Sequence, residues 1–194
     1  MDRISKLIRQ PSSNSREGED YSPLLTRVKF RHAFRSDLLA LEWEGEYAHF
    51  RRLYSEAYHY TELGRAIIWI AELSEVGVIG QLFVHLKSDR RELADGHTSA
   101  YIYGFRIRPA YQSKGIGTKM LKITENDLLL RGYKVVNLNV GQQNDRARQL
   151  YERLGYMVIG SDPGRWSYYD QHGRRQDVNE PAWRLQKKLV KTYE

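Results

Sequence analysis

The chain has 194 residues, of which 41% are hydrophobic and 28% charged, so it can bury a core and is expected to fold as one domain. It contains no cysteine, which excludes disulfides, thiolate metal sites and a cysteine nucleophile. The net charge of +7 fits several anionic partners, but the basic residues are scattered, so a solvated basic surface is favoured and no nucleic-acid partner is expected.

Residues 1–20 are polar and contain Pro11 among serines, and we expect a flexible arm there. A single domain is expected over residues 21–194. The N-terminal segment lacks the apolar centre of a secretory signal, and the longest apolar run, 66–71, is far shorter than the roughly 20 residues of a membrane-spanning helix. We therefore expect a cytoplasmic protein with no membrane partner.

The first half of the domain shows two helical patterns after one strand. Alternation of Val28 and Phe30 with charged residues predicts a strand over 26–32. Ser36 is expected to cap a short helix that contains three leucines. A longer helix is indicated by apolar residues with the spacing of one buried stripe, namely Phe50, Leu53, Tyr54, Ala57 and Tyr58.

The remainder alternates strands with helices. A hairpin is predicted from 66–73 and 78–86, and Pro109 ends a strand over 99–108. Further strands are expected at 134–140, 156–159 and 182–190, and helices at 116–131 and 144–154. The segment between the last two strands is polar and aromatic. Because strands and helices alternate only in this half, a mixed sheet covered by helices fits better than a fully parallel one.

The segment from Phe105 to Thr118 is the most informative part of the chain. A strand ends at Pro109, a turn follows, and Gly115 and Gly117 open a helix. Helix N-termini expose unpaired N–H groups, and glycine lets an anion approach them, so this segment could bind phosphate or simply be a glycine-rich helix start. Lys114 adds a cation, but the spacing matches neither the P-loop nor the dinucleotide fingerprint.

Two motifs in this order resemble those of the GNAT superfamily of acetyl-CoA-dependent N-acetyltransferases. The first is Ile107-x-Pro-x-x-Gln112-x-x-Gly115-x-Gly117, and the second is Asn144-x-x-Ala147-x-x-Leu150-Tyr151-x-x-Leu154-Gly155-Tyr156. The resemblance covers about residues 26–190. It implies an α/β (α+β) fold with a mixed, mostly antiparallel sheet of six to seven strands, about four helices, and a splay between the fourth and fifth strands.

The resemblance also implies acetyl-CoA as co-substrate. Its pantetheine arm would pair with backbone groups of Phe105, Arg106 and Ile107, because an unpaired strand offers N–H and C=O groups to a ligand. Its pyrophosphate would bind the N–H groups of the following loop, which comprises Gln112, Ser113, Lys114, Gly115, Ile116, Gly117 and Thr118. Asn144 is expected to cap a helix and, by the resemblance, also to bind cofactor or substrate; the two roles are compatible.

The implied chemistry is direct attack of an amine on the thioester, with Tyr151 as the acid that protonates the departing thiolate. Tyr151 could instead be an aromatic packing residue of an amphipathic helix. The general base is open, because the fourth strand has no carboxylate and the fifth has Asn139 where one would be sought. Glu72, His85 and Tyr103 are candidate substitutes, each better explained as structural, and a water chain is another alternative.

The acceptor is expected to be a primary amine, either on a small molecule or at a peptide N-terminus, and residues 166–172 are expected to flank it. An alternative is a catalytically inactive acyl-CoA-binding sensor of the same fold, and a protein N-terminal acetyltransferase is an alternative within the enzyme class. The six histidines are dispersed, so no metal site is expected. A monomer or a homodimer fits the sequence equally well.

Overall fold

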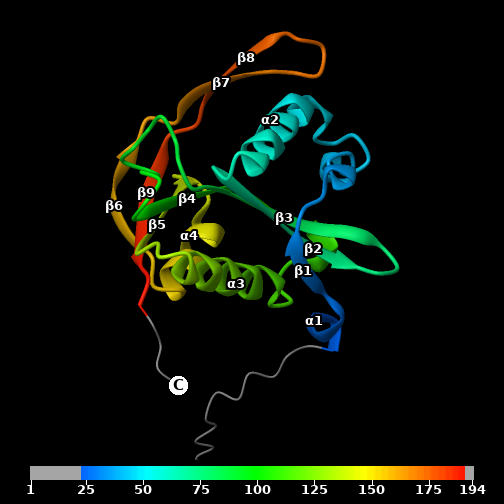
Figure 1. The fold of residues 1–194 in the computed structure, drawn as a ribbon, viewed down its shortest axis with the longest axis horizontal. Helices are drawn as coiled ribbons and strands as arrows, with labels where there is room; N and C mark the ends of the chain where they lie inside the picture. Colours follow the sequence, from blue (N-terminus) through cyan, green and yellow to red (C-terminus); the bar gives the residue numbers. More distant parts are fainter. Residues whose placement is uncertain (1–22, 191–194) are drawn as a thin grey trace, which may run out of the picture.

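The computed structural model describes residues 23–190, in which a seven-stranded mixed sheet carries helices on both faces (Figure 1). The strand order is β1-β2-β3-β4-β5-β9-β6, and only β4 and β5 run parallel. A separate hairpin is formed by β7 and β8. The strands are β1 (Lys29–His32), β2 (Ala66–Leu73), β3 (Gly77–His85), β4 (Ser99–Ile107), β5 (Val135–Gly141), β6 (Met157–Asp162), β7 (Arg165–Tyr169), β8 (Arg175–Asn179) and β9 (Ala182–Lys188).

Two buried clusters divide the core between the faces of the sheet. Helices α3 (Ile116–Leu130) and α4 (Asp145–Arg153) cover one face, and α2 (Arg51–Glu62) covers the other (Figure 1). On the α3 face the helix buries Met120, Leu121 and Leu128 against the sheet. On the α2 face Tyr54 stacks on Phe83 at 5.7 Å between ring centroids. The mixed, mostly antiparallel fold expected from the sequence is confirmed.

The parallel pair β4–β5 separates halfway along its length. Pairing runs from Ser99 with Val135 to Ile102 with Leu138 and stops there. Beyond that point β4 stays with β3 and β5 stays with β9. One extra residue in β4 makes a bulge at Gly104, whose φ is +57° and whose added Cβ would lie 2.8 Å from the Phe83 ring. The expected splay between the fourth and fifth strands of the sheet is thus present.

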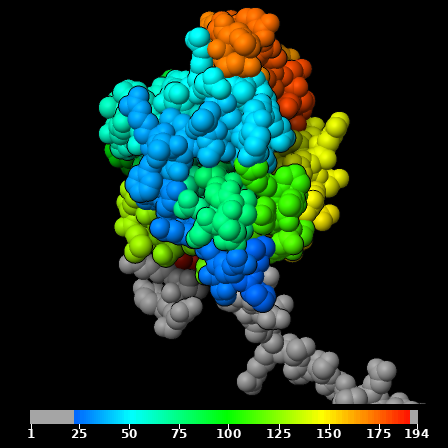
Figure 2. Space-filling view, turned by 90° about the vertical axis from the view of Figure 1, so that its right-hand side faces the viewer, coloured from blue at the N-terminus to red at the C-terminus, as the bar shows by residue number. Residues whose placement is uncertain are grey.

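Three parts of the chain differ from the sequence-based expectation. In place of a short helix capped by Ser36, residues 34–50 form 3₁₀ turns at Arg35–Asp37, Ala40–Glu42 and Ala48–Phe50, because Trp43 and Glu44 take positive φ. Residues Pro23–Arg27 form a short helix, α1, so the first strand starts later than expected. The polar aromatic segment forms the β7–β8 hairpin, which stands above the α2 layer (Figure 2).

The expected arm at residues 1–20 and the two ends of the expected domain, 21–22 and 191–194, lie outside the described residues. Across residues 23–190 there is no helix with the length and apolarity needed to span a membrane.

Candidate active site

A cavity of about 580 Å³ lies where β4 and β5 separate. The end of β4, the loop before α3 and the helix α4 form its walls. The structure brings together in this lining most of the residues expected from the sequence: Phe105, Arg106, Ile107, Gln112, Ser113, Gly115, Gly117, Thr118, Asn144 and Tyr151. Lys114 and Ile116 are not part of the lining; Ile116 is only 1% exposed and packs in the core beneath α3.

Four further lining residues were not expected: Arg146, Ala147, Leu150 and Arg153, all on α4. The lining contains arginines but no aspartate or glutamate. A cavity with cationic side chains and no carboxylate attracts anions, and its partly enclosed walls strengthen that attraction relative to open water.

The loop before α3 presents a row of backbone donors to this cavity. Within the described part of the chain, the N–H groups from Ser113 to Thr118 have no hydrogen-bond acceptor. Gly115 is the N-cap of α3 with a φ of +79°, and Ser113 has a φ of +58°. These left-handed residues turn successive N–H groups inward, and such a concave row at a helix start binds phosphate.

Peptide groups of β4 also face the gap. The Arg108 N–H donates to the Ile79 carbonyl oxygen of β3 at 2.8 Å. Because N–H and C=O groups alternate in direction along a strand, those of Ile107 point away from β3 and toward the gap. Consistently, the Ile107 carbonyl accepts from the Gln112 side chain at 2.8 Å rather than from a strand. The gap therefore offers hydrogen bonds to a ligand that lies along β4.

Arg146 links α4 to the phosphate-binding loop candidate. Its guanidinium donates to Gln112 Oε1 at 3.1 Å and to Ser113 Oγ at 2.7 Å, and no carboxylate pairs with it among the residues that the structure describes. Sequence reasoning missed this residue, although its place two positions after the cap at Asn144 puts it on the exposed first turn of α4. Arg146 therefore adds an unneutralised cation beside the row of N–H groups.

Tyr151 and Asn144 occupy the α4 wall of the cavity. Tyr151 is 8% exposed, and its ring meets that of Tyr156 edge-on at 5.7 Å. Burial raises the pKa of the Tyr151 phenol, so it keeps its proton at neutral pH. The Asn144 side-chain oxygen accepts from the Ala147 N–H at 3.1 Å, which is the helix-capping role expected from sequence.

None of the candidate substitutes for a general base lines the cavity. Glu72 pairs with Arg31 at 2.9 Å where β1 and β2 meet. His85 stacks on Tyr103 at 4.3 Å and pairs in register with Tyr101, which lies where β4 is still paired with β5. Desolvation lowers the pKa of His85 to about 4, an effect that Asp89 partly opposes, and burial raises the pKa of Tyr103. Both residues act as neutral packing groups at physiological pH.

This environment predicts a pH-dependent contribution of His85 to stability. Its pKa is about 4 when folded and 6.5 when unfolded, so unfolding takes up a proton as the pH falls below 6.5. The free energy of unfolding therefore falls as the pH is lowered from about 6.5 to about 4, and the pKa difference of His85 accounts for up to about 3 kcal/mol of that fall. We expect the free energy of unfolding, measured by denaturant melts over this pH range, to fall less on acidification in His85→Phe than in the wild type. An equal fall in the two proteins would contradict this.

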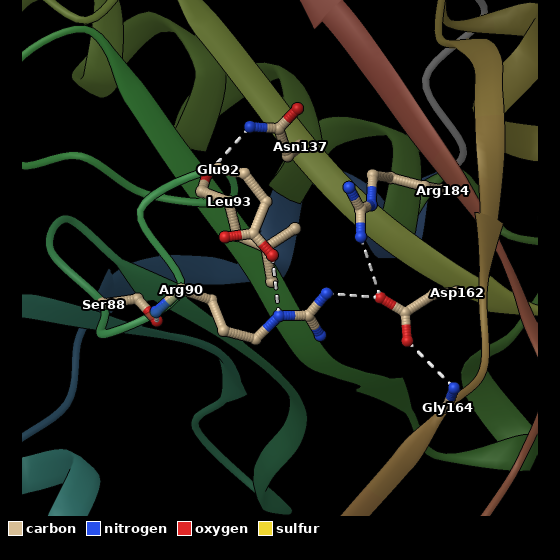
Figure 3. A network of polar contacts seen from close by, with 8 residues as sticks. All are labelled: Ser88, Arg90, Glu92, Leu93, Asn137, Asp162, Gly164 and Arg184. Atoms are coloured by element: carbon tan, nitrogen blue, oxygen red, sulfur yellow. Dashed lines mark hydrogen bonds and ion pairs between the residues drawn. The ribbon is translucent and has the colours of Figure 1, made fainter.

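The α2 side of the gap is lined by aromatic rings and ion pairs. The Phe50 ring lies 5.0 Å from Tyr168 and 6.4 Å from Trp166 of the hairpin, so residues expected to flank an acceptor lie near the β4 edge. Asp162 is 3% exposed and accepts from both Arg90 and Arg184 (Figure 3). These contacts tie the loop after β3 to β6 and β9.

The comparisons with known proteins agree with this geometry. Residues 35–156 match the model of the acetyltransferase (GNAT) family, which is more than half of the chain. The chain belongs to the acetyltransferase (GNAT) family.

Two curated relatives match part of the chain. The uncharacterized N-acetyltransferase YycN of Bacillus subtilis is 27% identical over 89 residues, which cover 46% of this chain and 54% of that protein. The mycothiol acetyltransferase of Propionibacterium freudenreichii is 27% identical over 90 residues, which cover 44% of this chain and 29% of that protein. The matched regions thus span about half of one relative and less than a third of the other.

Solved structures share the fold over most of both chains. The ribosomal-protein-S18-alanine N-acetyltransferase of Escherichia coli superposes with a TM-score of 0.63 at 18% identity, covering 86% of this chain and 97% of that one. The spermidine/spermine N-acetyltransferase SpeG of Vibrio cholerae gives the same TM-score and identity, covering 84% and 94%. At this identity the likeness extends to the fold alone. Over residues 23–190, no group of three or more His, Cys, Asp or Glu could hold a metal ion.

Proposed function

We propose that the protein is an N-acetyltransferase that moves an acetyl group from acetyl-CoA to a primary amine by direct attack on the thioester. The observation that carries this proposal is the row of N–H groups from Ser113 to Thr118, which have no acceptor among residues 23–190 and open onto a cavity at the β4–β5 gap whose lining contains no carboxylate. These donors fit a diphosphate, and the gap-facing peptide groups of β4 fit the amides of a pantetheine arm.

Acetyl-CoA, when bound, supplies the thioester whose acetyl group is transferred. The N–H groups of residues 113–118 and the Arg146 guanidinium hold the phosphates by charge-assisted hydrogen bonds. A gap-facing N–H of β4 stabilises negative charge on the carbonyl oxygen. Tyr151 holds a proton on Oη at the cavity wall, from which a departing thiolate can take it. Overall an amine N–H and a thioester become an amide and a thiol, which balances the protons.

The acceptor is the less constrained half of the proposal. The two solved relatives named above act on a ribosomal-protein alanine and on spermidine or spermine, so the shared fold accommodates both peptide and small-molecule amines. A peptide N-terminus therefore remains the alternative acceptor. A monomer or homodimer in the cytoplasm stays a prediction. An inactive acyl-CoA sensor is disfavoured because Tyr151 lies in the cavity lining, although no carboxylate base accompanies it.

The function is tested by incubating the purified full chain with acetyl-CoA and a panel of primary amines, with release of free thiol as the readout. Amine-dependent thiol release is the expected result. Tight binding of acetyl-CoA without transfer to any amine, in a panel that includes polyamines and short peptides, would instead support the sensor. A chain that binds neither CoA nor acetyl-CoA would refute both readings.

Arg146 provides a quantitative check of the phosphate site. We expect Arg146→Gln to weaken CoA binding about 10-fold at low salt, because one charge-assisted contact is lost. The difference should shrink at high salt, since screening weakens exposed charge pairs. Isothermal titration calorimetry at two salt concentrations measures both effects. Arg148→Gln is the matched control, because Arg148 lies on the same helix, pairs with Glu152 at 2.8 Å and does not line the cavity. Equal losses in both variants would contradict a specific role for Arg146.

A further inference from the structure

Arg106 presents a cation without a carboxylate partner on the α2 side of the gap. Its guanidinium donates to the Tyr54 phenol at 3.2 Å and lies over the rings of Tyr47 and Phe50, at 4.3 and 5.1 Å from their centroids. Within residues 23–190 no acidic side chain forms an ion pair with it. The cation is thus held in one place by aromatic rings while its charge remains unneutralised.

Neighbouring arginines on this side are neutralised. Arg108, two residues further along, makes a bidentate pair with Glu44 at 2.7 and 2.9 Å. Arg90 and Arg184 share the buried Asp162, and Arg90 also contacts Glu92 (Figure 3). The contrast with Arg108 shows that the neighbouring 34–50 segment can supply an acidic partner, yet Arg106 has none among residues 23–190.

An unused hydrogen-bonding group lies on the same face. Gln81, which pairs in register with Arg106, is fully buried and contacts the Tyr54 phenol, so it is not that group. On β5, the buried side-chain oxygen of Asn139 has no hydrogen-bond partner among residues 23–190. Val136, Leu138 and Val140 point to the α3 face, so alternation puts Asn139 on the α2 face. A buried polar atom without a partner is costly, and a donor on a ligand in the gap would relieve that cost at Asn139.

We propose that the amine acceptor carries an anionic group, a carboxylate or a phosphate, which Arg106 binds on the α2 side of the gap. The Asn139 oxygen accepts a hydrogen bond from the N–H of the same acceptor. The inference rests on the proposed acetyl transfer and names its substrate class as amines with a negative charge. The aromatic rings beside Arg106 hold its guanidinium in place, and the planar guanidinium matches a carboxylate with two hydrogen bonds.

The test compares each anionic amine with its uncharged counterpart. β-Alanine and 6-aminohexanoate are paired with their amides, 2-aminoethyl phosphate distinguishes phosphate from carboxylate, and spermidine represents cationic amines. The readout is the ratio of kcat/KM within each pair, at equal concentrations of unprotonated amine. We expect the wild type to prefer the anionic member by at least about 10-fold, which is the size of a hydrogen bond to a charged group.

Two substitutions assign that preference to Arg106. Arg106→Gln should reduce the ratio to near one, and Arg106→Lys should retain part of it because the charge remains. Arg108→Gln is the matched control and should leave the ratio unchanged, because Arg108 is already paired with Glu44. Arg106→Gln and Arg106→Lys both keep the backbone groups of residue 106. We therefore expect both variants to bind CoA, and calorimetry can verify this separately from the acceptor preference.

A binding experiment keeps the inference testable without turnover. β-Alanine titrated into the CoA-loaded protein should bind at least about 10-fold more tightly than β-alaninamide, and Arg106→Gln should abolish the difference. Acetylation of neutral or cationic amines with no preference for anionic ones would overturn the inference and leave the proposed function standing. Failure to bind CoA would overturn the proposed function, and the inference with it.

Discussion

Replacing Gly117 with glutamate is expected to abolish CoA binding while the chain still folds. Gly117 lies in the first turn of α3 with ordinary backbone dihedrals, and an added Cβ would approach the Phe105 ring to 3.3 Å. The side chain must therefore extend into the cavity, where its carboxylate blocks the row of N–H groups and repels a diphosphate. We expect the affinity to fall by at least about 100-fold, which corresponds to about 2.7 kcal/mol.

The control for this experiment places the same charge elsewhere. Gly160 on β6 is exposed, has no positive φ and no heavy atom within 4 Å of an added Cβ. Gly160→Glu should bind CoA as the wild type does. Calorimetric titration measures the affinities, and thermal melts verify that both variants are folded. Retained CoA affinity in a folded Gly117→Glu protein would show that the phosphates bind elsewhere.

Replacing Tyr151 with phenylalanine is expected to lower kcat by about 100-fold or more, the usual size of a general acid contribution. Binding of CoA should change little, because the ring and its contact with Tyr156 remain. The defect should be smaller for a thioester whose thiol is more acidic, since such a leaving group needs less help from a proton. A purely structural role would not produce this dependence on the leaving group.

Tyr156→Phe is the matched control for Tyr151. The Tyr156 phenol is also buried, but it donates to Glu125 at 2.8 Å and does not line the cavity. Loss of this hydrogen bond to a carboxylate should destabilise the fold by about 2 kcal/mol and leave kcat near the wild-type value. An unchanged kcat in Tyr151→Phe would show that Tyr151 is a packing residue and not the general acid.

The phosphate-loop candidate could be predicted from sequence because its determinants are local. Pro109, Gly115 and Gly117 end a strand and start a helix within a few residues, and the structure puts the backbone of this turn beside the cavity. The splay of the sheet was predicted from the family resemblance instead, because no local sequence feature of β4 or β5 indicates where the pairing of these parallel strands stops. The bulge at Gly104, close to the point where the pairing stops, lies against the Phe83 ring of another strand, a contact that local sequence does not show.

The parts that could not be predicted depend on contacts between distant residues. The β7–β8 hairpin contains many polar residues, and its rings at Trp166 and Tyr168 pack on Phe50, which lies 116 and 118 positions earlier in the chain. The sequence predicts a short helix that Ser36 caps and that contains three leucines, whereas the folded segment 34–50 forms 3₁₀ turns in which Trp43 and Glu44 adopt positive φ. Arg106 and Arg146 are important here because no carboxylate among the described residues pairs with them. Which arginines pair with carboxylates depends on the folded structure and cannot be read from the sequence.

The most direct test of the account is a titration of the isotope-labelled protein with CoA, followed through its backbone N–H resonances. The account predicts that the largest shifts fall on residues 105–107 and 113–118, with the loop resonances moving downfield as their N–H groups acquire phosphate acceptors. Saturable binding that leaves those resonances in place and shifts another surface would contradict it.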